Sequence, residues 1–226
     1  MRPPLGCVER EPFTRPAVKF GASESVRRLR PVLALSIAVT VATAPAARAA
    51  DATISITADG PHSRRETLRL GDSAAWMNND SVTHRVRSSP RGFFATRGLE
   101  MGETSRAIPF GSAGSFPYVV LPESGEEGLL EVPVRLRPGS NASPTPGAVI
   151  RVRVATERHP GRTYDVQRRR DDGRWVTIAE DTRRVVVRFR PRTTGTYWFR
   201  ARLTIARLGI TSRWSPPEDE LVVPPP

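Results

Sequence analysis

Short stretches of alternating polar and apolar residues, separated by turn residues, dominate the sequence after residue 50. In 149–155, Ile150, Val152 and Val154 alternate with arginines, so the apolar side chains would face a core and the arginines would face water. A period of two indicates β-strands, and no helical periodicity occurs in this part of the chain. Short strands at this spacing are typical of β-sandwiches, so we predict an all-β protein with two of them.

Turn residues delimit the expected strands. In the first half, the strands are expected at 52–57, 67–70, 74–77, 84–88, 104–110, 115–120 and 129–134. In the second half, they are expected at 149–155, 164–168, 175–178, 185–189, 196–203 and 221–223. Asp171-Asp172-Gly173 between two of these strands predicts a tight hairpin.

A segment rich in proline, glycine and serine at 138–147 has the composition of a linker. The charge balance changes there. Residues 51–137 contain 10 Arg against 11 Asp and Glu, a net charge of −1, whereas residues 147–226 contain 17 Arg against 9, a net charge of +8. We therefore expect one domain at 50–137 and a second, basic domain at 148–226.

The first 49 residues are expected to be a leader that includes a signal peptide. Arginines at 27, 28 and 30 precede an apolar run at 32–44, which is too short to span a membrane comfortably. Ala47-Arg48-Ala49 then has the small-x-small pattern of a cleavage site, which predicts cleavage near Ala49-Ala50 and a secreted, extracellular protein of the cell envelope. Residues 1–25 are either an extension of the leader or the result of a start codon placed upstream of Val26. The mature chain would contain no membrane span, and its oligomeric state is not indicated.

A series of small motifs in the first domain resembles the cupredoxin family, which includes plastocyanin and azurin. The motifs occur in the family's order from residue 51 to residue 136, and they comprise Gly71-Asp72, Trp76, Asn78, Asp80, His84, Gly92-Phe93-Phe94, Met101-Gly102, Phe110 and Gly114-Ser115-Phe116-Pro117-Tyr118. The resemblance implies a Greek-key β-sandwich. It also implies that His84 stands at the position of the first copper ligand.

The other half of the copper site is missing from the sequence. Cupredoxins bind copper through two histidines, a cysteine thiolate and usually a weak axial methionine. Here a valine follows Tyr118 where the family has its cysteine, Cys7 is the only cysteine, and no histidine lies between His84 and His159. Met101 lies in a turn before the expected ligand loop. We therefore expect no cofactor, with His84 as a remnant ligand; the alternative is a copper-binding electron-transfer protein of this family.

The second domain resembles a fibronectin type III domain over residues 147–223. Gly161–Arg169 with Trp175 is similar to the middle hairpin, Gly195–Arg202 is similar to the Tyr-x-Phe-Arg-x-Arg strand, and Ser212-Arg213-Trp214-Ser215 is similar to the Ser-x-Trp-Ser segment. The family's tryptophan of the second strand is not evident, so a related immunoglobulin-like sandwich stays open. Such domains mostly act as spacers or adhesion modules.

Arginine supplies nearly all of the formal charge of +12, since Lys19 is the only lysine. A basic face for an anionic polymer, a solvated face and stacking on tryptophan all fit this composition. We favour two of these interpretations over polymer binding: a solvated face, and stacking of Arg200 and Arg202 near Trp198 or Trp214. The arginines on or beside expected strands are Arg168, Arg169, Arg170, Arg183, Arg184, Arg188, Arg190, Arg192, Arg200 and Arg202.

No motif for nucleophilic, phosphate-binding or metal-dependent catalysis occurs in the sequence. Glu123, Glu126 and Glu127 form a carboxylate cluster, which is interpreted as a solvated turn. We therefore expect a secreted, non-enzymatic scaffold or interaction protein. Its partner is expected to be a cell-surface protein or polysaccharide rather than a nucleic acid.

Overall fold

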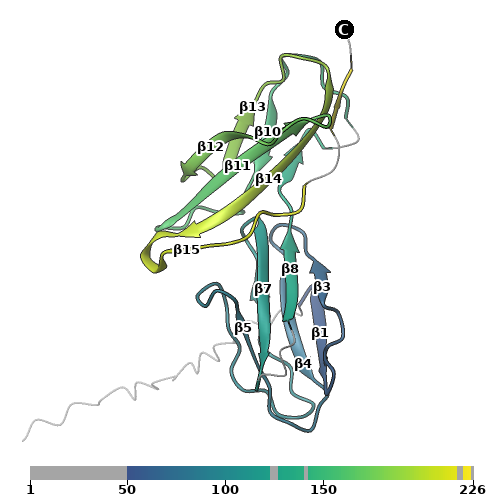
Figure 1. Cartoon of the computed structure of the whole chain (residues 1–226), viewed down its shortest axis with the longest axis vertical. Helices are drawn as coiled ribbons and strands as arrows, with labels where there is room; N and C mark the ends of the chain where they lie inside the picture. Colours follow the sequence, from purple (N-terminus) through teal and green to yellow (C-terminus); the bar gives the residue numbers. More distant parts are fainter. Residues whose placement is uncertain (1–49, 123–126, 140–141, 218–220, 225–226) are drawn as a thin grey trace, which may run out of the picture. The chain divides into compact units, whose positions relative to one another are not determined.

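The computed structural model of the chain describes residues 50–122, 127–139, 142–217 and 221–224 (Figure 1). These residues lie within one compact unit that runs from residue 46 to residue 226. The predicted leader at 1–49 and two glutamates of the predicted carboxylate cluster, Glu123 and Glu126, lie outside the described residues.

The first set of strands forms two four-stranded sheets, with the orders β2-β1-β4-β6 and β3-β8-β7-β5. The pairs β1/β4 and β3/β8 are parallel, and the other neighbours are antiparallel. The strand bounds are β1 Ala52–Thr57, β2 Gly60–Pro61, β3 Arg65–Thr67, β4 Ser73–Asn78, β5 Arg85–Ser88, β6 Ile108–Pro109, β7 Gly114–Leu121 and β8 Glu127–Val132.

Aromatic side chains fill the core of this first sandwich. Trp76 on β4 is fully buried; its indole ring stacks on Phe94 at 5.4 Å and meets the edge of Tyr118 at 5.6 Å. Tyr118 on β7 lies opposite Gly128 on β8, and its ring occupies the space where a Cβ atom of residue 128 would stand. A side chain at 128 would therefore displace the ring, which explains why this strand position carries glycine.

The second set of strands forms a three-stranded sheet with the order β13-β10-β9 and a larger sheet with the order β12-β11-β14-β15, in which β16 also pairs with β14. The large sheet is built on the long strands β11 and β14, which lie side by side (Figure 1). The bounds are β9 Arg135–Arg137, β10 Ile150–Arg153, β11 Arg162–Arg170, β12 Val176–Thr182, β13 Val186–Phe189, β14 Gly195–Ile205, β15 Ile210–Thr211 and β16 Leu221–Val223, with a short 3₁₀ helix, η1, at Ala206–Leu208.

Alternation along the strands separates the core of the second sandwich from its surface. On β14, Tyr197, Phe199, Ala201 and Leu203 are buried, whereas the residues that alternate with them are partly exposed. On β10, Ile150 and Val152 are fully buried, whereas the arginines between and after them are exposed. The fold-class prediction, all-β with two β-sandwiches, is confirmed.

Strand β9 departs from the predicted division of the chain. Its residues 135–137 were assigned to the first domain, before the linker at 138–147, but they pair antiparallel with β10 and so complete a sheet of the second sandwich. Val134, just before β9, and Leu136 within it are buried. The domain boundaries themselves stay a prediction.

Most predicted strands coincide with observed ones, and the hairpin at Asp171-Asp172-Gly173 joins the antiparallel strands β11 and β12. Two predictions differ from the structure: the strand at 67–70 is wrong, because β3 ends at Thr67, and only Ile108–Pro109 of the expected strand at 104–110 form β6. The backbone N–H of Leu68 still donates to the carbonyl of Glu131, after which the chain turns through Gly71. The part of the chain that the structure describes contains no helix with the length and hydropathy that a membrane crossing requires.

Candidate functional site

His84, the predicted remnant ligand, lies just before β5 in the first sandwich and is 8% exposed. Its backbone exchanges two hydrogen bonds with Leu99, at 3.0 and 2.7 Å. Its Nε2–H donates to Oδ2 of Asp80 at 2.8 Å. This hydrogen bond is the main reason why the pKa of Asp80 lies below its ordinary value.

The Trp-x-Asn-x-Asp motif builds the turn that holds this pair. Asn78 is fully buried, and its side-chain amide donates to the carbonyls of Val82 at 2.7 Å and Leu99 at 2.9 Å. Its Oδ1 accepts from the backbone N–H of Asp80 at 2.9 Å. Every polar atom of the Asn78 side chain therefore shapes the turn that leads to His84, which is a structural role for the motif.

The residues around His84 do not fit a type 1 copper centre. The Nδ1 atom of His84 is buried and has no hydrogen-bond partner among the described residues, so the imidazole offers one free nitrogen. No thiolate follows Tyr118 on β7, because the next two residues are Val119 and Val120; Val120 lies opposite Val86 and is 2% exposed. Nowhere in the described residues do three His, Cys, Asp or Glu side chains gather in a metal-binding group.

Other groups that could supply metal ligands lie elsewhere or are in the wrong protonation state. Met101 is 70% exposed in a turn, and His159 contacts Glu157 at 3.3 Å in the second sandwich. Burial raises the pKa of Tyr118 to about 12, so its phenol is neutral and supplies no anionic oxygen. The His84–Asp80 pair is therefore best described as a buried hydrogen-bonded pair that ties a turn to β5.

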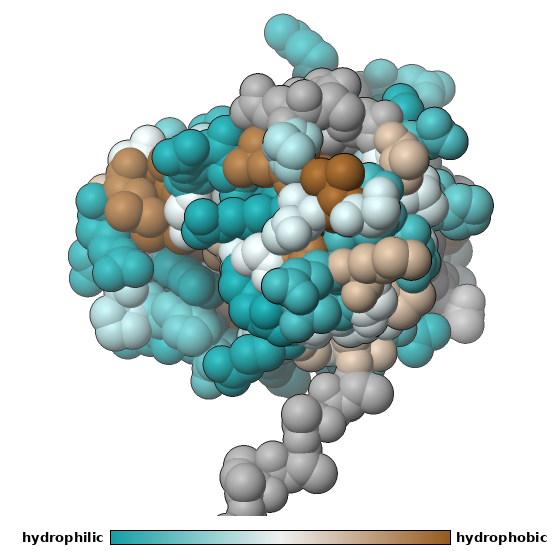
Figure 2. All heavy atoms as spheres, turned by 90° about the horizontal axis from the view of Figure 1, so that it is seen from below, coloured by the Kyte–Doolittle hydropathy of each residue, from teal (hydrophilic) through white to brown (hydrophobic). Residues whose placement is uncertain are grey.

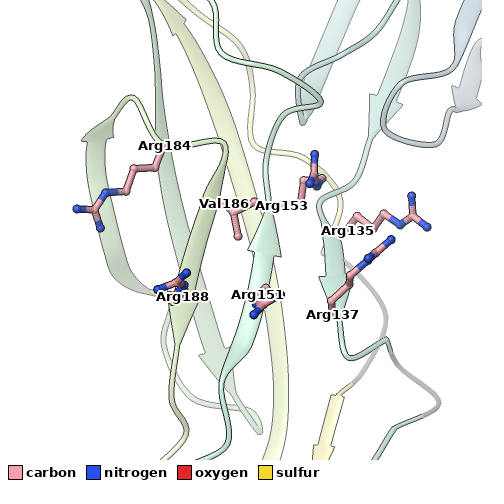
Figure 3. Close-up of a pocket in the computed structure, with 7 residues that line it drawn as sticks. All are labelled: Arg135, Arg137, Arg151, Arg153, Arg184, Val186 and Arg188. Atoms are coloured by element: carbon pink, nitrogen blue, oxygen red, sulfur yellow. The ribbon is translucent and has the colours of Figure 1, made fainter.

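Six arginines gather on the outer face of the β13-β10-β9 sheet, and we call this group the arginine lattice. Its members, all exposed, are Arg135, Arg137, Arg151, Arg153, Arg184 and Arg188. They line a groove of about 560 Å³, to which Val186 also contributes (Figure 3).

The strand register brings the lattice arginines opposite one another. Arg151 on the central strand lies opposite Arg188 on β13 and opposite Arg137 on β9. Arg153 lies opposite Arg135 in the next row of the same face. Figure 3 shows Arg188, Arg151 and Arg137 at one level across the three strands. Like charges directly opposite each other in antiparallel strands are destabilising.

The arginine lattice has no carboxylate partner among the described residues. Arginines outside the lattice do form ion pairs with carboxylates, and they include Arg65, Arg97, Arg170 and Arg202. Within the lattice, Arg153 donates to the backbone carbonyl of Thr156 at 3.2 Å. The face therefore presents nearly all of its positive charge to water.

The arginines on the opposite sheet have a different environment, which we call the arginine–tryptophan ladder. Its members are Arg169, Arg200, Arg202, Trp175, Trp198 and Trp214. The guanidinium of Arg200 lies 4.1 Å from the ring centre of Trp175 and 4.8 Å from that of Trp214. Arg202 lies 4.7 Å from Trp214, so the predicted stacking of these two arginines is confirmed.

Exposed apolar side chains are scattered rather than clustered. Figure 2 shows a mainly hydrophilic face with hydrophobic residues in small, separate groups. Among the described residues, the large exposed hydrophobic side chains are Val82, Met101, Val176, Leu208 and Val222. Charge, rather than an apolar patch, is therefore the distinctive property of the surface.

Of the lattice arginines, Arg184 and Arg188 are predicted from the sequence as arginines on or beside strands, and Arg151 and Arg153 are predicted to face water. Arg135 and Arg137 are not among the predicted surface arginines. The alternation along β10 predicted that its arginines would be exposed. No local signal indicated that β9 and β13 would place further arginines beside them, because that placement depends on strand register.

No protein-family model matches the chain, and no curated protein matches it. Similar solved structures include an amicyanin variant with Cu(I), at 20% identity over 35% of this chain and 79% of that chain, with a TM-score of 0.32. A second amicyanin variant, in the reduced Cu(I) form at pH 4, has 20% identity over 38% and 85%, with a TM-score of 0.34. A cytokine receptor complex has 20% identity over 62% and 85%, with a TM-score of 0.31. At these values nothing about function follows from the likeness.

Proposed function

We propose that this protein is an exported, non-enzymatic interaction protein that contacts an acidic partner at the cell envelope. In this proposal the first sandwich is a cupredoxin-like scaffold without a copper centre. The second, fibronectin type III-like sandwich presents the arginine lattice to the partner. The observation that carries the proposal is the set of exposed arginines that face one another across three strands without a carboxylate partner among the described residues.

Two features of the chain's ionisable groups support a role without catalysis. His84 and Asp80 engage each other inside a turn, and Asp165 accepts a hydrogen bond from Arg202 at 2.8 Å within the second sandwich. Both arrangements use the charged groups to hold backbone segments in place. A general acid or base would instead need an open approach to a substrate.

The alternative, a copper-binding electron carrier, requires a thiolate for the strong equatorial bond and the electron path. Titration of the purified full chain with Cu(II) tests it. We expect no intense visible absorption band, because a single imidazole with no sulfur ligand does not form a type 1 centre. An intense band that His84→Ala abolishes would refute the scaffold assignment.

Cation-exchange chromatography tests the interaction itself. We compare a row variant, Arg137→Gln/Arg151→Gln/Arg188→Gln, with a dispersed variant, Arg64→Gln/Arg106→Gln/Arg207→Gln, which removes the same charge from exposed positions elsewhere. On a sulfonate matrix the row variant is expected to elute at clearly lower salt than the dispersed variant, because a clustered charge binds a charged surface more tightly than scattered charge does. Equal elution of the two variants would refute a cationic binding face.

A further inference from the structure

Protection of sheet edges does not explain the arginine lattice. Charged side chains on edge strands are a common device against edge-to-edge pairing, and β9 and β13 are the edges of their sheet. Arg151 and Arg153 lie on β10, however, which is the central strand and has both edges paired. Since like-charged cross-strand pairs are unfavourable, a central strand with two arginines opposite further arginines indicates a role outside folding.

The shape of the lattice suits an extended ligand. Its groove is open and crosses three strands, and no aromatic ring is among the described residues that line it. A second depression begins where β13 ends, and its lining includes Phe189, Tyr197 and five arginines: Arg168, Arg170, Arg174, Arg190 and Arg192. The positive surface thus continues along the edge of the sandwich, farther than one small anion would need.

We propose that the arginine lattice binds a linear acidic polysaccharide that bears an anionic group on each sugar unit. This inference rests on the proposed function and names the partner of that same face. Neighbouring strands lie about 4.8 Å apart, which is close to the length of one sugar unit, so a chain that crosses the sheet presents about one anion to each arginine of a row. Guanidinium groups bind carboxylate and sulfate oxygens through paired N–H donors.

The described residues that line the lattice groove disfavour a nucleic acid as its ligand, because none of them is aromatic. Proteins that bind single strands combine positive charge with aromatic rings on which bases stack. The rings of the second sandwich's tryptophans instead contact arginines of the ladder on the other sheet. The predicted export of the protein also places it where acidic polysaccharides occur.

Isothermal titration of the full chain at about 50 mM NaCl, where charge interactions are weakly screened, tests the inference. The probes are polygalacturonate, which carries carboxylates, dextran sulfate, which carries sulfates, and uncharged dextran. We expect binding to one or both charged polymers and none to dextran. The row variant should bind at least about tenfold more weakly, and the dispersed variant should lose less than about threefold. The tighter of the two charged polymers identifies the preferred anionic group.

Single-stranded DNA of matched charge is the competing ligand. If it binds at least as tightly as the better polysaccharide, the polysaccharide assignment is wrong, although the cationic face of the proposed function survives. Equal losses of polysaccharide affinity in the row and dispersed variants, or binding to uncharged dextran, would also overturn the inference. A cooperative melting transition establishes that both variants fold, so weak binding is not the result of unfolding.

Thermal melting supplies an independent readout. A polymer that binds only the folded state raises the melting temperature, by several degrees at a concentration far above its dissociation constant. The increase should be nearly absent in the row variant and retained in the dispersed variant. An equal increase in both variants would show that the polymer acts at another place and would contradict the proposed site.

Discussion

The two sheets of the second sandwich carry the same residue type in opposite electrostatic settings. In the ladder, Arg200 lies between two indole rings, and its guanidinium donates to Oε1 of Gln167 at 3.1 and 2.8 Å. In the lattice, Arg151 lies between two other arginines. The effect of an arginine on stability therefore depends on the residue that the strand register places beside it.

Close packing of arginines also disfavours the charged form of an arginine in the ladder. Burial, followed by the charges of Arg169 and Arg202, lowers the pKa of Arg200. The aromatic faces and the Gln167 oxygen offset this cost, because both interact favourably with a cation. Among the described residues, the lattice arginines have no aromatic face or side-chain oxygen as a partner, and only Arg153 donates to a carbonyl, so most of their repulsion is uncompensated.

Replacement of Trp214 by alanine tests the ladder with the largest expected effect. The change removes a half-buried indole and two cation–π contacts, so the free energy of unfolding should fall by about 3 kcal/mol. Urea denaturation measures this value. Trp214→Phe, which keeps a ring, should recover most of the loss. A loss below about 1 kcal/mol for Trp214→Ala would mean that the ladder contributes little.

Neutralisation of Asp165 tests the ionic support of the ladder. The carboxylate of Asp165 accepts from Nε of Arg202 at 2.8 Å and from the backbone N–H of Asp181 at 3.0 Å. Asp165→Asn should lower the free energy of unfolding by about 2 kcal/mol, because hydrogen bonds to charged groups are strong and the site is buried. Glu180→Gln, an exposed position on the same sheet, should change stability by less than about 0.5 kcal/mol. Similar losses of stability from the two substitutions would show that Asp165 has no special role in the ladder.

Removal of one charge from the lattice should raise the free energy of unfolding, whereas the substitutions in the ladder should lower it. Arg151→Gln relieves repulsion toward Arg188 and Arg137, so the free energy of unfolding should rise by about 0.5 kcal/mol at low salt. The gain should vanish near 1 M NaCl, where charges are screened over about 3 Å. Arg207→Gln, in η1, is the matched control and should change stability less. A destabilised Arg151→Gln protein would contradict the uncompensated repulsion.

Asp80→Asn, which removes the negative charge of the His84–Asp80 pair in the first sandwich, is expected to have the smallest effect on stability. The pKa of Asp80 is below its ordinary value of 3.8, so the folded state binds fewer protons than the unfolded state in acid. The stabilisation is present above about pH 3.8 and is lost as the pH falls through the lowered pKa. Melting temperatures measured from neutral pH into this acid range should therefore decline less in Asp80→Asn than in the unchanged protein. Parallel declines would show that the pair does not respond to protonation.

Strand positions and their buried faces were predictable from the residues. The expected strand at 52–57 matches β1, and the predicted core face of β14, with Tyr197, Phe199 and Leu203, is buried. Such predictions succeed because the alternation of side chains along a strand is local. The hydrogen bond from His84 to Asp80 was not predictable, because it depends on the turn that Asn78 shapes.

Local patterns in the residues thus specified an all-β chain and the exposure of the β10 arginines. The arginine lattice arose only when β9 and β13 paired with β10 from positions far apart in the chain. Register is a non-local property, since it is set by hydrogen bonds between strands and by the shared core beneath them. For that reason arginines that look solvated one at a time form a single cationic face in the folded molecule.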